Sequence, residues 1–265
     1  MMASGPIGLF DSGIGGLSIM KEIRRLLPEE DLIYVADSKY CPYGERTSEE
    51  IIKRSFIITK FLLTKGVKLI VVACNTASIA ALQSLRDNFK LPFVGVEPAV
   101  KQAALHTKDK KVGVLATELT LSGERFSSLV EKFAGGLNVI NQPCPGLVEK
   151  VEAGEIDGSE TEALVKEYIE PLKAYGVDVV VLGCTHYPFL RPIVEKFLGA
   201  GVKVIDTGEP VARQTRRLLA ERSLLTSNLE GGKEWFFTSG DPKLVAPVIN
   251  KLWGNLGEGV ARILT

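Results

Sequence analysis

Two cysteines, Cys74 and Cys184, stand in local sequences of the same kind. Each follows a run of apolar, mostly β-branched residues and precedes an expected helix, and each is followed by polar residues, Asn75-Thr76 and Thr185-His186. The pKa of a thiol, ordinarily about 8.5, falls toward neutrality at a helix N-terminus, so a thiol placed there can donate or accept a proton. Two such groups on opposite faces of one carbon can remove its hydrogen from one face and return a proton to the other. The pair therefore indicates inversion of a carbon centre, although a single free cysteine is more often a small buried hydrophobe.

The neighbouring polar residues suit a substrate that carries both a carboxylate and an ammonium, as an amino acid does. Four side chains are expected beside helix N-termini, which bind carboxylates: Asn75, Thr76, Thr117 and Thr185. Asp11 and Ser12 end the first predicted strand. Asp11 suits an ammonium group or a nearby thiol, with helix capping as the alternative. His186 can hold a proton near Cys184 or bind a carboxylate, with a packing role as the alternative.

Short apolar runs are the elements that must position these residues. Seven of them are typical of buried strands in a parallel sheet: 7–10, 32–36, 69–73, 92–96, 111–115, 178–182 and 202–205. Helical stretches lie between them, such as the segment that begins after an N-cap at Ser48 and stops at Gly66. Alternating strands and helices indicate βαβ architecture.

The second half of the chain repeats landmarks of the first half in the same order. Residues 65–77 match 175–187 at an offset of 110, which pairs Cys74 with Cys184. Three further matches have offsets of 103 to 112: Cys41-Pro42 with Cys144-Pro145, 8–12 with 113–117, and 97–102 with 209–214. Repeated α/β units would pack about a pseudo-two-fold axis, and open parallel sheets bind ligands beyond the carboxyl ends of their strands. We therefore expect two pseudo-symmetric parallel-sheet α/β domains, with the active site in the cleft between them and the two thiols on its opposite sides.

The domain boundaries follow from the repeat. The first domain is predicted to comprise 1–97 and 208–265, and the second 98–207. Most of the chain after Gln214 has no counterpart in the first half, but it contains a strand-like 234–238, a turn at 239–242 and a helix through Leu252. This segment should pack against one unit and make that domain discontinuous.

The balanced composition of charged residues argues against some classes of binding partner. Lysine plus arginine and aspartate plus glutamate number 32 each, so no net field would draw the protein to nucleic acid or an anionic membrane. The opening MMASGPIGLF has no basic flank before an apolar stretch, and no apolar run approaches the roughly 20 residues of a membrane helix. We expect a cytoplasmic protein with a small-molecule substrate, and a homodimer.

Cofactor and metal sites are not predicted. The four cysteines are scattered, without the paired spacing of a zinc site. The GxGxxG pattern of a dinucleotide loop is not met, because Ser18 occupies the place of its third glycine. Gly13, Gly15 and Gly16 are instead expected to permit a tight turn from strand to helix.

These motifs resemble those of the aspartate/glutamate racemase superfamily, and in particular its glutamate racemases. The resemblance covers essentially the whole chain and rests on four motifs: DSGxGG at 11–16, DxxxxPYG at 37–44, ACNTA at 73–77 and LGCTHYP at 182–188. It implies that Cys74 and Cys184 are the proton donor and acceptor, acting without a cofactor. The substrate, L- or D-glutamate, would be held by Asp11, Ser12, Tyr43, Gly44, Asn75, Thr76, Thr185 and His186. Thr117 and Glu152 are similar to further family positions, Glu152 assisting a cysteine, although Glu149-Lys150 stands where the family has a proline and an apolar residue.

The resemblance also implies a cellular role, and three alternative functions remain to be compared with it. D-glutamate feeds peptidoglycan synthesis, hence cell-wall biogenesis and cell shape. Aspartate racemases resemble this chain but usually have Glu at the position of His186, and decarboxylases of the superfamily use one cysteine. A two-lobed amino-acid-binding protein could share the polar ligands without any chemistry, but such proteins are usually exported.

Overall fold

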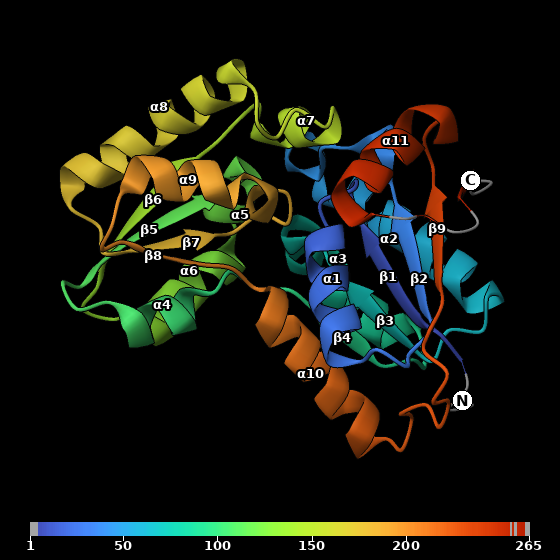
Figure 1. The fold of residues 1–265 in the computed structure, drawn as a ribbon. Coiled ribbons are helices and arrows are strands. Elements are labelled where there is room, and N and C mark those ends of the chain that lie inside the picture. Colours follow the sequence, from blue (N-terminus) through green and yellow to red (C-terminus); the bar gives the residue numbers. More distant parts are fainter. Residues whose placement is uncertain (1–4, 255, 257–258, 263–265) are drawn as a thin grey trace. The chain divides into compact units, whose positions relative to one another are not determined.

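The structure is a computed structural model that describes residues 5–254, 256 and 259–262 (Figure 1). The predicted absence of a leader concerns the opening segment, of which residues 1–4 lie outside the described residues. The chain divides into two compact units, Met1–Val96 with Gly208–Thr265, and Glu97–Thr207. The first boundary falls after Val96, one residue before the predicted one. Among the described residues, no helix has both the length and the apolar character needed to cross a membrane.

The first unit contains a parallel sheet with the strand order β10-β9-β2-β1-β3-β4. Its strands are β1 (Ile7–Asp11), β2 (Leu32–Ala36), β3 (Leu69–Val72), β4 (Phe93–Gly95), β9 (Glu234–Thr238) and β10 (Val260–Arg262). Every residue of β1, β2 and β3 is buried, as continuous apolar runs predict for a sheet covered on both faces. Because β9 pairs with β2, the late segment belongs to the same sheet, and the first unit is discontinuous in sequence.

Helices cover both faces of this sheet. They are α1 (Leu17–Leu26), α2 (Ser48–Thr64), α3 (Asn75–Asn88), α10 (Gly208–Glu221) and α11 (Pro242–Trp253). The chain moves from β1 to β2 in one direction along the sheet and from β2 back past β1 to β3 in the other. Right-handed crossovers therefore put α1 and α2 on opposite faces. Consistently, α1 packs on α10 and α11, whereas α2 packs on α3 (Figure 1).

Thr47, rather than the predicted Ser48, caps α2. Its hydroxyl accepts from the N–H of Glu50, and the Glu50 carboxylate accepts from the N–H of Thr47 over 2.9 Å, a reciprocal capping box. Both residues are candidates from sequence, but only Thr47 has a glutamate three positions later. The helix ends at Thr64, and Gly66 follows with a φ of +71°, which glycine adopts without strain.

The second unit contains a parallel sheet with the order β6-β5-β7-β8. Its strands are β5 (Lys111–Ala116), β6 (Asn138–Pro143), β7 (Val179–Leu182) and β8 (Lys203–Ile205). Its helices are α4 (Val100–His106), α5 (Glu118–Ser122), α6 (Glu124–Phe133), α7 (Leu147–Glu152), α8 (Ser159–Tyr175) and α9 (Arg191–Leu198). On one face Val100 and Phe126, from α4 and α6, share a buried cluster with Val114 and Val181. Helices α8 and α9 pack on each other.

The two sheets repeat one topology and one register. The order β6-β5-β7-β8 corresponds to β2-β1-β3-β4. Gly8 pairs with Ile70 and Gly113 with Val180, which are the partners that offsets of 105 and 110 predict. A Cβ on Gly8 would lie 3.2 Å from Leu62 of α2, and one on Gly113 would lie 2.9 Å from Leu172 of α8. In both units a strand glycine therefore lets the equivalent helix approach closely.

One predicted landmark is not equivalent in structure. Cys144 directly follows Pro143, the last residue of β6, whereas Cys41 comes five residues after the end of β2 at Ala36. The Cys-Pro match thus pairs positions at different distances from their strands. Four extra residues after β2 explain its lower offset of 103.

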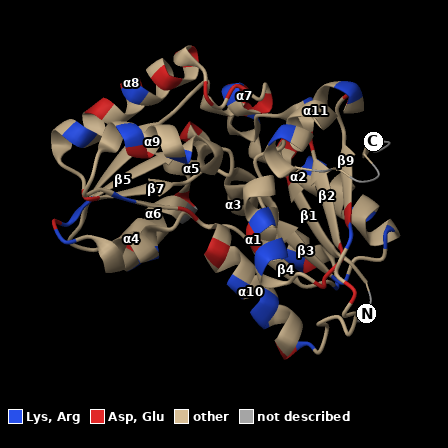
Figure 2. Ribbon diagram, viewed as in Figure 1, with Lys and Arg blue, Asp and Glu red and all other residues tan. Residues whose placement is uncertain are grey.

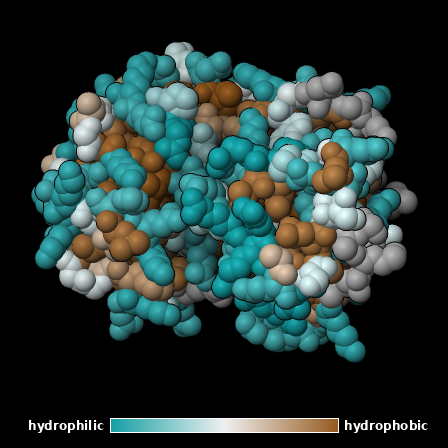
Figure 3. Space-filling view, turned by 60° about the horizontal axis from the view of Figure 1, so that its bottom comes forward, coloured by the Kyte–Doolittle hydropathy of each residue, from teal (hydrophilic) through white to brown (hydrophobic). Residues whose placement is uncertain are grey.

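Charged residues lie mainly on helices and loops. The central strands β1, β2, β3, β5 and β7 are tan along nearly their whole length, and blue and red segments alternate on α8 (Figure 2). On the face in Figure 3, hydrophilic residues cover most of the surface and hydrophobic ones form separate patches. This distribution fits the balanced charge of the sequence.

Candidate active site

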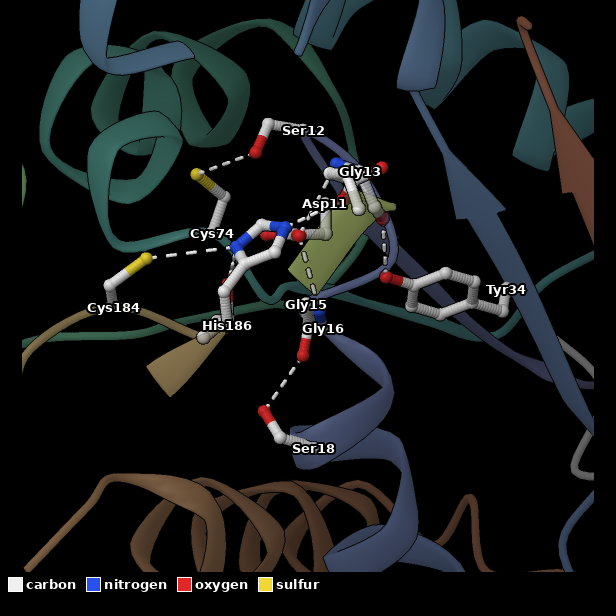
Figure 4. Close-up of polar contacts among 12 residues, drawn as sticks. Asp11, Ser12, Gly13, Gly15, Gly16, Ser18, Tyr34, Cys74, Cys184 and His186 are labelled. Carbon is white, nitrogen blue, oxygen red and sulfur yellow. Dashed lines mark hydrogen bonds and ion pairs between the residues drawn. The ribbon is translucent and has the colours of Figure 1, made fainter. Parts of the chain in front are cut away.

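Cys74 is the N-cap residue of α3, directly after Ala73 and the end of β3. It is 5% exposed, and its sulfur accepts a hydrogen bond from the N–H of Ala77 over 3.4 Å. Its thiol also points to the hydroxyl of Ser12, 3.9 Å away (Figure 4). A helix N-terminus favours negative charge, so this position stabilises a thiolate. The prediction of a helix beginning at this cysteine is confirmed.

Asp11 ends β1 and is fully buried in the same unit. Its Oδ2 accepts from the N–H groups of Gly13 and Gly16 over 3.3 and 3.1 Å (Figure 4). Asp11 is therefore not the N-cap residue of α1, which is Gly16. A Cβ on Gly16 would lie 2.8 Å from both the Asp11 Cβ and the Tyr34 hydroxyl. Close approach, rather than a positive φ, is the reason for glycine here.

The first residues of α3 place an unusual group beside Cys74. Asn75 is 3% exposed, and neither its Oδ1 nor its Nδ2 has a hydrogen-bond partner among the described residues. An unpartnered buried amide is costly in a folded protein unless a ligand or water completes it. Thr76 follows on the same helical turn and is also buried.

Tyr43 and Gly44 lie in a short 3₁₀ turn, η2 (Tyr43–Glu45), which packs against α3. Tyr43 is buried, and its hydroxyl donates to the carboxylate of Asp37. Burial, followed by the charge of Asp37, raises the pKa of Tyr43 well above its ordinary value, so the phenol stays protonated. A thiolate at Cys74 adds to this rise.

In the second unit, Cys184 follows β7 by two residues and is 8% exposed. Its sulfur lies 3.7 Å from Nδ1 of His186, and Nε2 of the same ring lies 2.6 Å from Oε1 of Glu152 at the end of α7. Figure 4 shows the imidazole beside this sulfur. Cys184 precedes only a 3₁₀ turn, η3 (Tyr187–Leu190), before α9. The prediction of the same helix N-terminal setting as Cys74 is therefore wrong for Cys184, which has an imidazole instead.

Thr185 and Thr117 also lie at strand ends of the second unit. Thr185 is buried, with its hydroxyl 3.5 Å from Nδ1 of His186. Thr117 directly follows β5 and caps α5, where its hydroxyl accepts from the N–H of Thr120 over 3.4 Å. In the repeated register Thr117 corresponds to Ser12, because Phe10 and Leu115 occupy equivalent rungs.

Cys144 is buried near Cys184 but has a different character. Burial raises the pKa of its thiol, and a charge on Cys184 raises it further, so the thiol stays neutral. It donates to the carbonyl of Gln142 over 3.3 Å, while Tyr187 donates to the carbonyl of Cys144 over 3.2 Å. This thiol is suited to packing rather than proton transfer.

Two charged residues beside Tyr43, namely Asp37 and Arg54, are not among the site residues predicted from the sequence. Both are buried, and the Arg54 guanidinium donates two hydrogen bonds to the Asp37 carboxylate. Asp37 could have been found, because it directly follows the strand 32–36 as Asp11 ends the first one. Arg54 lies within a helical pattern and carries no local signal.

The chain is similar to known proteins both in sequence and in fold. The family model of Asp/Glu/Hydantoin racemase matches residues 7–215. A glutamate racemase of Stutzerimonas stutzeri is 49% identical over 250 residues, which are 94% of each chain. The Escherichia coli glutamate racemase solved with L-glutamate and an activator is 32% identical with a TM-score of 0.86, covering 98% of each chain. The Francisella tularensis enzyme solved with D-glutamate is 30% identical with a TM-score of 0.86, covering 99% of this chain and 98% of that one.

The likeness spans almost the whole of both chains in sequence and in fold, so it is not confined to one unit. The strand-end cysteines and their polar neighbours lie within the matched residues. The chain therefore belongs to the Asp/Glu/Hydantoin racemase family and, within it, to the glutamate racemases, which are isomerases that act on amino acids.

Proposed function

We propose that this protein interconverts L- and D-glutamate by a two-thiol mechanism without a cofactor. The observation that carries the proposal is the equivalence of Cys74 and Cys184. They follow equivalent strands of two units that share one topology and register. Each sulfur also has its own polar partner, the N–H of Ala77 at the start of α3 for Cys74 and the imidazole of His186 for Cys184.

Each turnover moves two protons, one from the substrate to a thiolate and one from the other thiol to the substrate. A turnover in the reverse direction then restores the original protonation state of both thiols. A thiolate takes the proton from the α-carbon, so the Cα–H bond breaks, an S–H bond forms and the α-carbon becomes a carbanion. The other thiol then loses its proton to the opposite face of that carbon. By resemblance to the family, Cys74 acts on D-glutamate and Cys184 on L-glutamate. The product leaves the two thiols with exchanged protonation states, which serve the reverse reaction.

Residues around each thiol are proposed to hold the substrate. Asn75 supports this most directly, because its buried amide lacks a partner among the described residues and can both donate to a carboxylate and accept from an ammonium. Asp11, His186 and Glu152 are proposed to assist proton transfer. The further binding residues in the proposal are Asp11, Ser12, Tyr43, Gly44, Thr76, Thr117, Thr185 and His186.

The wider role is proposed from the family resemblance. D-glutamate is a component of peptidoglycan, so the protein would act in the cytoplasm in cell-wall biogenesis and cell shape. We also propose a homodimer. Light scattering at several protein concentrations tests the dimer independently of activity.

Deuterium exchange tests the reaction itself. In deuterated water the protein should convert L-glutamate into a racemic mixture carrying deuterium at the α-carbon, and dialysis against EDTA should leave the rate unchanged. L-aspartate in a parallel reaction tests the substrate preference. Binding without deuterium uptake would support an amino-acid-binding protein, and faster exchange with aspartate would support an aspartate racemase.

A further inference from the structure

Asp37 is a buried carboxylate at the same sheet edge as Asp11. Its backbone N–H donates to the carbonyl of Asp11 over 3.0 Å, which ties the two strand ends together. Its side chain is fully buried, and a buried carboxylate needs a partner of opposite charge. Arg54 is that partner, since its Nε and Nη2 donate to the two carboxylate oxygens over 2.9 and 2.8 Å. The forked geometry fixes the orientation of both groups.

The same ion pair holds two tyrosines, one on each side of Cys41-Pro42. The Tyr43 hydroxyl donates to Oδ2 of Asp37 over 2.5 Å. The guanidinium carbon of Arg54 lies 3.9 Å from the centroid of the Tyr40 ring, which is a stacking contact. Tyr40 also donates its N–H to the carbonyl of Asp37 over 2.8 Å. The segment 40–43 is therefore fastened at both ends to one buried pair.

This arrangement limits how the segment can meet a substrate. The hydroxyl of Tyr43 is engaged by Asp37 and its side chain is 1% exposed, so the groups that remain are backbone groups of Tyr43 and Gly44. Backbone groups bind well only when the loop that carries them is fixed before binding. The turn η2 packs against α3, the helix that Cys74 caps.

We propose that Arg54 is a positioning residue for substrate binding, which acts through Asp37, Tyr40 and Tyr43 without touching the substrate. The inference rests on the proposed racemisation of glutamate. It predicts that Arg54 sets the affinity for the part of glutamate common to both enantiomers. The chemical step, which belongs to the thiols, depends on it much less.

The test compares three variants with a matched control. Arg54→Gln removes the charge and the paired hydrogen bonds to Asp37. It should raise KM about tenfold or more for both enantiomers, while kcat stays within about threefold of the wild-type value. Arg54→Lys restores the charge but not the fork or the stacking, so it should recover part of the loss. Tyr43→Phe keeps the ion pair and removes only the hydroxyl, and should raise KM by a smaller factor.

Arg24→Gln is the control. Arg24 is partly buried and, like Arg54, pairs with a carboxylate, that of Glu234 over 2.6 Å, but it binds the carbonyls of Pro28 and Glu30 at the amino end of β2. Its loss should lower Tm without changing KM. The positioning role is rejected if Arg54→Gln lowers Tm and leaves KM unchanged. If Arg54→Gln fails to fold, Tyr43→Phe decides, and an unchanged KM in that variant rejects the role.

Failure of the inference and failure of the proposed function give different results. A wild-type protein that racemises glutamate, together with variants that keep its KM, rejects the positioning role alone. A wild-type protein that neither binds nor racemises glutamate rejects the proposed function. Calorimetric titration of D-glutamate into a Cys74→Ala, Cys184→Ala background, with and without Arg54→Gln, measures the affinity without turnover and should show the same loss of about tenfold or more.

Discussion

His186 links Cys184 to Glu152: one ring nitrogen lies 3.7 Å from the sulfur and the other lies 2.6 Å from a carboxylate oxygen. A carboxylate on one ring nitrogen fixes the orientation of an imidazole and the tautomer that it presents at the other nitrogen. Cys74 has different support, since it accepts from the N–H of Ala77 at the start of α3. The two thiols therefore occupy equivalent places but rely on different groups.

This difference predicts a one-sided effect of His186→Asn. The two enantiomers have equal free energies, so kcat/KM must fall equally in both directions of racemisation and cannot identify the affected thiol. A glutamate analogue with a leaving group on the β-carbon needs only the first abstraction. Elimination from its L form, proposed to depend on Cys184, should slow about 10- to 100-fold at saturation, and elimination from the D form should change little.

Glu152→Gln is the companion to that experiment. It removes the charge behind His186 and keeps a hydrogen-bonding side chain, so it should slow the same elimination by a smaller factor. Equal slowing of both enantiomers at saturation by His186→Asn would contradict the assignment of His186 to Cys184 alone.

Replacing either cysteine tests the division of labour. Cys74→Ala and Cys184→Ala each remove the base for one direction and the acid for the other, so each should reduce racemisation by about 10²- to 10⁴-fold or more. Glutamate binding, measured by calorimetry, should largely persist because the other polar groups remain. Cys74→Ala should still eliminate from the L analogue, and Cys184→Ala from the D analogue.

Cys144→Ala is the matched control for these two variants. Cys144 is also a buried cysteine outside any disulfide, but its thiol stays neutral. It should retain racemisation at nearly the wild-type rate. A near wild-type rate in Cys74→Ala or Cys184→Ala would instead reject the two-thiol mechanism.

The sheets illustrate what the sequence can predict. Seven predicted strands correspond to observed ones within one or two residues. Short apolar runs rich in β-branched residues are typical of buried strands, which is why they could be predicted. Strand β6, with the sequence NVINQP, was missed. It lies at the edge of its sheet and is mostly exposed or half-buried, so it carries no continuous apolar run. Its pairing with β5 depends on the tertiary fold.

In the candidate site, too, some residues follow from a local sequence pattern and others depend on the tertiary fold. Residues at strand ends, such as Asp11 and Cys74, could be identified because parallel strands end at one edge of a sheet. Arg54 could not, since it reaches Asp37 across 17 residues from within a helix. The 3₁₀ turn after Cys184 was also missed, because Tyr187-Pro188 fits the start of either kind of helix.

Asn75 provides a test that separates binding from stability. Its buried amide lacks partners among the described residues, so Asn75→Leu, which is similar in shape, should leave Tm unchanged or higher. The variant also loses hydrogen bonds to a charged substrate worth about 1.5–3 kcal/mol, so KM should rise roughly 10- to 100-fold. Thermal unfolding and steady-state kinetics on one preparation measure both. A fall of several degrees in Tm with an unchanged KM would show that Asn75 supports the fold instead.

Cys144 predicts a pH dependence of stability at alkaline pH. Burial raises the pKa of its thiol well above the ordinary value, so the folded state keeps a proton that the unfolded chain releases at alkaline pH. Its contribution is fully present below the unfolded pKa and is lost as pH rises above it, by about 1.4 kcal/mol per pH unit for one proton. Urea unfolding of the wild type and of Cys144→Ala between pH 7 and pH 10 should therefore show a shallower alkaline decline in the variant. Tyr43 and Tyr187, whose pKa values are also raised, should keep part of the decline in both proteins. Parallel curves for the two proteins would mean that Cys144 titrates alike in the folded and unfolded states.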